Sequence, residues 1–90
     1  MATLERKEID RQAYYSGAQT IIEDLKNPEK DVFWCKKCIQ VALVAQAKKD
    51  GVAEEFPDAF YYLDKEYVWG NTRSELIKTL EDFKTVIALE

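Results

Sequence analysis

Two cysteines at Cys-x-x-Cys spacing are the residues of this chain most suited to chemistry. Cys35 and Cys38 flank Lys36 and Lys37, and the sequence contains no further cysteine and no histidine. Such pairs can cycle between dithiol and disulfide, or supply half of a tetrahedral zinc site. Because structural zinc takes four ligands, a metal site here would need two chains that each contribute both thiols. We therefore expect no metal site or cofactor within a single chain.

Trp34 precedes this pair, so the segment Trp34-Cys35-Lys36-Lys37-Cys38 resembles the Trp-Cys-x-x-Cys site of thioredoxin-like proteins. That resemblance implies redox chemistry and a strand that leads into the first cysteine. The preceding residues 27–31 are instead typical of a charged loop. On the alternative interpretation, which we favour, both thiols are small buried groups on a helix and stay reduced in a cytoplasmic protein.

Arg11, Tyr14 and Tyr15 form a second candidate site, with Lys7 one helical turn before Arg11. A guanidinium beside aromatic rings can receive an anionic, stackable ligand such as a nucleotide, or a carboxylate of a protein partner. Tyrosines at helical spacing are also typical of cores and interfaces. We favour a protein interface here, with a small-ligand site and a solvated helix face as the alternatives.

The remaining composition excludes several classes of function. No nucleophile, general base and orienting group can be recognised together, and the missing histidine removes the commonest base near neutral pH, so we expect no enzyme. The 13 basic and 17 acidic residues give a net charge of −4 that is spread along the chain. Nucleic-acid binding requires a concentrated basic face, so no nucleic-acid partner is expected.

No membrane association is expected either. The uncharged apolar stretch at residues 38–47 is about half of the roughly 20 residues that a membrane crossing needs. The first residues show no apolar segment behind a basic start, so no secretory signal is visible. These features predict a cytoplasmic location.

Glycine and proline residues separate four segments with apolar residues at helical spacing. The sequence predicts an all-α fold, a small four-helix module in which residues 1–90 form a single domain. Expected boundaries are the Asn27-Pro28 pair, an N-cap at Asp31, a left-handed stop at Gly51 and a capping box from Thr72 to Glu75. The predicted helices cover residues 3–26, 31–49, 57–69 and the segment from 72 onward.

The second and fourth helices have the clearest apolar faces. In the second, the central helix, a period of 3.6 residues brings six residues to the face predicted to be buried: Trp34, Cys35, Cys38, Val41, Ala42 and Ala45. In the fourth, Leu76, Leu80, Phe83 and Ile87 recur at coiled-coil-like spacing.

The third segment is ambiguous between a helix and a hairpin. Phe60, Leu63 and Tyr67 share a helix face, and Pro57 suits a first helical turn. Residues 60–63 and 66–69 are nevertheless rich in strand formers. We favour the helix.

The first helix changes character along its length. Its C-terminal half has apolar residues at positions 14, 18, 21, 22 and 25, but the same face continues backward to Arg11 and Lys7. Unpaired buried charge is costly. We therefore expect residues 1–13 to project as an N-terminal arm or to form an interface with another chain, and we predict self-association.

One family resemblance implies a different fold. The segments Glu55-Phe56-Pro57-Asp58 and Gly70-Asn71-Thr72-Arg73-Ser74-Glu75 resemble the strand and the helix entry of HicB-type antitoxins. The resemblance implies an α+β fold with a small antiparallel sheet, a strand over residues 39–48 and a C-terminal helix. It is carried as an alternative to the helical module.

These observations predict a non-enzymatic helical binding protein. It would be homo-oligomeric and act on a protein partner as an inhibitor or adaptor of phage or bacterial type. Two alternatives stay open. One is the capture of an anionic, nucleotide-like ligand by Lys7, Arg11, Tyr14 and Tyr15, and the other is a HicB-like antitoxin.

Overall fold

The chain folds into helices, as a computed structural model shows for residues 2–65 and 69–90, with side chains described from Arg6 onward. In chain order the elements are α1 (Ala2–Lys26), α2 (Val32–Cys38), the π-helix η1 (Ile39–Ala45), α3 (Gln46–Asp50), α4 (Val52–Glu55), α5 (Pro57–Leu63) and α6 (Arg73–Leu89). No strand occurs in the two described ranges. The predicted all-α class is confirmed.

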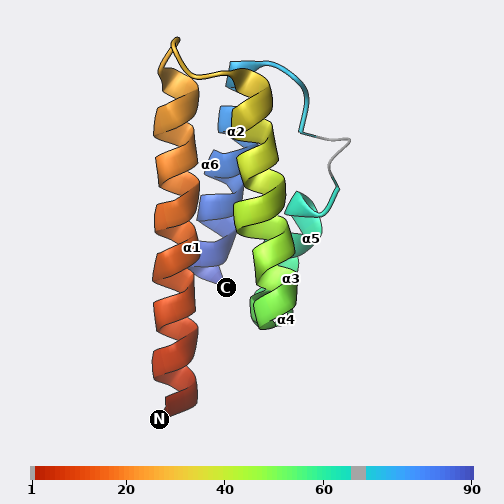
Figure 1. Cartoon of the computed structure of the whole chain (residues 1–90). Coiled ribbons are helices and arrows are strands. Elements are labelled where there is room, and N and C mark those ends of the chain that lie inside the picture. Colours follow the sequence, from red (N-terminus) through yellow and green to blue (C-terminus); the bar gives the residue numbers. More distant parts are fainter. Residues whose placement is uncertain (1, 66–68) are drawn as a thin grey trace.

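The α+β alternative is wrong, and with it the strand that the HicB resemblance implies over residues 39–48. This segment lies inside one continuous helical rod formed by α2, η1 and α3, which we call the central helix (Figure 1). The Asp31 side chain accepts a hydrogen bond from the Phe33 backbone N–H at the start of the rod. Gly51, at φ 79°, ends it in the left-handed conformation. Both predicted ends are therefore confirmed.

Three long rods, α1, the central helix and α6, lie side by side, and the short α4 and α5 occupy one end (Figure 1). The molecule is elongated, with extents of 43 × 22 × 22 Å. The N-terminal turns of α1 extend past the end of α6 (Figure 1). Further along α1, the predicted apolar face is confirmed, because all five of its members are buried: Tyr14, Ala18, Ile21, Ile22 and Leu25.

The central helix buries a different face from the one expected. Its buried residues are Cys35, Ile39, Leu43 and Ala47, at a constant spacing of four. Of the six residues predicted to be buried, only Cys35 is buried, and Trp34, Val41, Ala42 and Ala45 are exposed. The helix has a second apolar face, formed by the buried residues at a spacing of four, and that face is the one in the core. Hydrogen bonds in the π-helix span five residues and widen each turn, so residues spaced by four stay close to one line along the rod.

The third predicted helix is confirmed over Pro57–Leu63 and ends earlier than the expected residue 69. Trp69 is buried, and its indole N–H donates to the Leu63 carbonyl oxygen at 3.0 Å. This bond satisfies a carbonyl that a further helical turn would have used. Tyr67, which was expected on the face of Phe60 and Leu63, lies outside the described residues.

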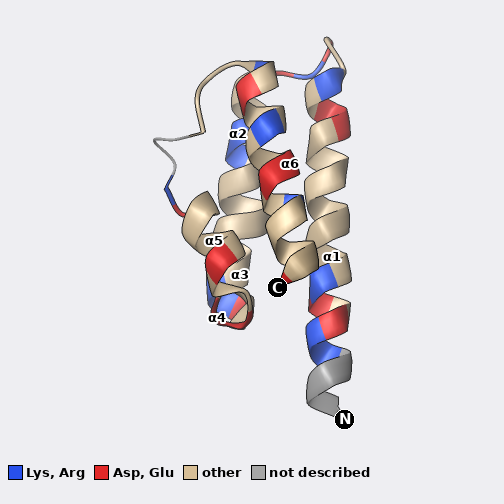
Figure 2. Cartoon of the chain, turned by 180° about the vertical axis from the view of Figure 1, so that it is seen from behind, with Lys and Arg blue, Asp and Glu red and all other residues tan. Residues whose placement is uncertain are grey.

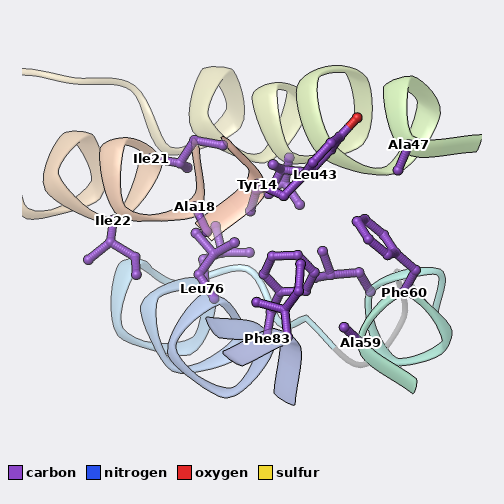
Figure 3. Packing of buried hydrophobic residues seen from close by; sticks show 14 of the residues in the cluster. Tyr14, Ala18, Ile21, Ile22, Leu43, Ala47, Ala59, Phe60, Leu76 and Phe83 are labelled. Atoms are coloured by element: carbon purple, nitrogen blue, oxygen red, sulfur yellow. The ribbon is translucent and has the colours of Figure 1, made fainter. Parts of the chain in front are cut away.

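The last helix has the start and the buried face that its sequence predicts. The Thr72 hydroxyl accepts from the Glu75 backbone N–H, and the Glu75 side chain accepts from the Thr72 N–H. Leu76, Leu80, Phe83 and Ile87 are all buried. Phe60 lies edge-on to both Tyr14 and Phe83, with ring centroids 5.5 and 5.2 Å apart, and so joins α1, α5 and α6 in one core (Figure 3).

Candidate functional site

The structure brings Lys7 and Arg11 together on one aromatic ring. The Lys7 ammonium and the Arg11 guanidinium lie 5.3 and 5.5 Å from the centre of the Phe56 ring. Arg11 Nε also donates to the Ile87 carbonyl oxygen at 3.1 Å, and Nη1 pairs with Glu8. The two cations on the apolar face of α1 therefore have partners within the chain. The free-energy cost of burying an unpaired charge, which the sequence analysis expected at these positions, does not arise.

The two tyrosines of the same candidate site point to different surroundings. Tyr14 is buried against Phe60, and burial is the largest cause that raises the pKa of its phenol, followed by the charges of Asp50 and Asp10. Tyr15 is 40% exposed, with the Lys84 ammonium 4.8 Å from its ring centre. Arg11, Tyr14 and Tyr15 thus do not line one common pocket.

The Cys35 and Cys38 thiols are free, the first buried and the second half-buried. Burial is the largest cause that raises the pKa of each thiol, and the charge of Asp24 acts in the same direction. Both therefore favour the neutral form near pH 7, which is a poor nucleophile and a poor metal ligand. Among the described residues no three histidine, cysteine or acidic side chains are grouped to hold a metal ion.

An apolar groove that the sequence analysis missed runs between α1 and the central helix. It has a volume of about 490 Å³. We call it the Trp34 groove and define it by six of its lining residues: Ala13, Gly17, Thr20, Trp34, Cys38 and Ala42. At Gly17 the two helices are close, since a Cβ atom added there would be in van der Waals contact with the Leu43 side chain at 3.4 Å.

A second hollow of about 240 Å³ continues the Trp34 groove across the central helix. It shares Trp34, Cys38 and Ala42 with the groove and adds Lys37 and Val41. Trp34 is 48% exposed, Val41 58% and the neighbouring Phe33 74%. Large apolar side chains that are scattered singly need no explanation, but a continuous exposed patch of them marks a binding surface.

Charge is confined to the ends of this surface. Residues 12–22 of α1 and residues 38–47 of the central helix contain no charged side chain. Figure 2 shows the uncharged middle of α1 between charged turns at both ends. At one end of the groove, Asp24 stands on the α1 wall and Lys37 on the side of the central helix.

The signal for this groove is present in the sequence as two overlapping patterns. The central helix has apolar residues at a spacing of four, Cys35, Ile39, Leu43 and Ala47, and a second apolar set around Trp34 and Val41. One helix with two apolar faces buries one and exposes the other, unless a second element covers it. The pattern alone does not say which face is inside.

Comparison of the chain with models of known protein families, with curated proteins and with solved structures gives no match. Within the described ranges, no helix is long and apolar enough to cross a membrane.

Proposed function

We propose that this protein is a non-enzymatic binding protein whose Trp34 groove receives an apolar helix of a protein partner. A protein assembled through such a contact acts as an inhibitor or adaptor of phage or bacterial type. The observation that carries the proposal is the exposed apolar surface formed by Trp34 and Val41 beside a hollow lined by Ala13, Gly17 and Ala42.

The shape and chemistry of the groove suit a helix. It lies between two antiparallel helices, so an incoming helix would complete a four-helix arrangement with α1, the central helix and α6 (Figure 1). Small residues at Ala13, Gly17 and Ala42 allow a close approach of the incoming backbone. Tryptophan side chains are common among the few interface residues that contribute most of the binding free energy between two proteins.

The π-helix is a second reason to assign a function to the surface that carries the Trp34 groove. π-helical turns are rare and are found frequently at functional sites. Here η1 turns Ile39 and Leu43 into the core and leaves Val41 and Ala42 outside.

The remaining parts of the proposal have narrower support. A cytoplasmic location is consistent with two free thiols three residues apart. Capture of an anionic nucleotide-like ligand has less support than helix binding, because the Arg11 guanidinium is engaged by Ile87 and Glu8 and the two tyrosines face apart.

Site-specific photo-cross-linking tests the proposal. Val41 is replaced by a photoreactive phenylalanine analogue in cells that make the protein, and Leu89, which is 84% exposed on α6, is replaced in a control. We expect one defined adduct at position 41, identified by mass spectrometry, and none at position 89. The adduct should vanish when Ala42→Phe fills the groove, while Ala88→Phe, at another exposed alanine, leaves it unchanged.

No adduct at position 41, or the same adducts at positions 41 and 89, would contradict the proposal. Unchanged thermal unfolding of the Ala42→Phe variant verifies that the groove was filled without unfolding the protein.

A further inference from the structure

We infer that the occupant of the Trp34 groove is the same surface of a second copy of this chain, in a two-fold symmetric dimer. This inference rests on the proposed function, because it names the partner of that groove. Its support comes from the fit of the surface to itself in shape and in charge.

The surface has large apolar side chains on one helix and small residues on the other. Trp34 and Val41 are exposed on the central helix, and Ala13 and Gly17 line the groove on α1. When two copies face each other across a two-fold axis parallel to the helices, α1 of one copy lies opposite the central helix of the other. Trp34 and Val41 of each copy then pack against the small residues on α1 of the other copy, which is the self-complementarity that a two-fold interface requires.

The charges at the end of the groove fit the same arrangement. α1 and the central helix are antiparallel, so Asp24 and Lys37 stand at the same end on opposite walls. In the two-fold arrangement each Asp24 faces the partner's Lys37. Within the described part of the chain neither side chain forms an ion pair. Two intersubunit pairs would therefore form without breaking an existing one.

The rest of the contact would be apolar. The uncharged stretches at residues 12–22 and 38–47 form the middle of the surface on both copies. Ile9 lies one helical turn before Ala13 on the groove side of α1 and is 65% exposed. It extends the apolar contact toward the N-terminal turns. An oppositely charged pair at one end of an uncharged surface fixes the register of the two copies.

Sedimentation equilibrium on the full chain measures the association. We expect a mass of twice 10.5 kDa at micromolar concentrations. Val41→Glu should weaken dimerisation by more than about 100-fold, because two carboxylates would be buried in the contact. Leu89→Glu, at a still more exposed leucine on α6, should leave it unchanged. Both substitutions are at exposed positions, so at concentrations low enough for the wild type to be monomeric both variants should unfold at the wild-type temperature.

A charge exchange tests the pairing itself. Asp24→Lys and Lys37→Asp should each weaken the dimer about fivefold or more, and the double variant should recover most of the loss. A monomer at all concentrations, a dimer that survives Val41→Glu, or a double variant as weak as the singles would overturn the inference. A monomeric chain that still gives a photo-adduct with another protein at position 41 would overturn the dimer and leave the proposed function standing.

Discussion

Arg73 Nη1 donates to the Leu25 carbonyl oxygen at 2.9 Å, so the first residue of α6 satisfies the last turn of α1. The same guanidinium also donates to the carbonyl oxygens of Asn27, Pro28 and Lys30. One side chain therefore holds the loop from α1 to the central helix in place, and with it the end of the groove at which Trp34 lies.

Arg73→Ala should lower the free energy of unfolding by about 2 kcal/mol, because the half-buried Leu25 carbonyl loses its donor. Arg73→Lys should recover only part of this loss, since an ammonium lacks the planar fork that reaches several carbonyls at once. Lys78→Ala is the control, because Lys78 is 78% exposed and its ion pair with Asp82 should contribute under about 1 kcal/mol. Urea unfolding measures all three. Equal stability of the arginine and lysine forms would contradict this role.

The two left-handed glycines should differ in their tolerance of a side chain. Gly70 has φ 80°, and a Cβ there would lie within 2.7 Å of the Glu75 side chain. Gly51 has φ 79° with open space around the position. We expect Gly51→Ala to cost about 1 kcal/mol for its backbone alone. Gly70→Ala should cost about 1 kcal/mol more, because it also displaces the capping box of α6. Similar midpoints for the two variants in thermal unfolding would argue against the steric contribution.

Acid should weaken the start of α6. The hydrogen bond from the Thr72 hydroxyl lowers the pKa of Glu75 below its ordinary value of 4.5, and the backbone N–H groups of Thr72 and Asn71 add to this. Because the folded pKa is the lower one, this stabilisation is present above pH 4.5 and is lost as the pH falls through the folded value. Glu75→Gln keeps the capping geometry without the titrating group.

Thermal unfolding from about pH 6 to pH 3 tests the assignment. The wild-type midpoint should fall more steeply on acidification than that of Glu75→Gln. Parallel curves for the two proteins would show that Glu75 does not contribute to the acid sensitivity.

Arg11 should be important for stability. Arg11→Ala removes the donor to Ile87 near the end of α6 and the cation above the Phe56 ring, so we expect a loss of about 1 to 2 kcal/mol. Arg6→Ala is the matched control, because the Arg6 side chain is 70% exposed and the change should stay within about 0.5 kcal/mol. Calorimetry measures the stability of both variants. If Arg11 were simply solvated, Arg11→Ala and Arg6→Ala would lower the free energy of unfolding by equal amounts.

The sequence by itself determined the ends of most helices and three of the buried faces. Asp31, Gly51, Pro57 and the pair Thr72 and Glu75 act through hydrogen bonds and backbone angles within a few residues of themselves. Such local physics is readable without tertiary structure. The regular apolar spacing of α1, α5 and α6 was equally informative, because each of these helices has one apolar face.

Tertiary structure decided which face of the central helix is buried and where the charged residues of α1 find partners. The helix has two apolar faces, and its assembly with the other helices places Ile39 and Leu43 in the core, with the Leu43 side chain next to Gly17 of α1. The partners of Arg11 are Phe56 and Ile87, which are 45 and 76 residues away in the chain. Long-range contacts of this kind depend on how the helices are assembled, so no local pattern encodes them.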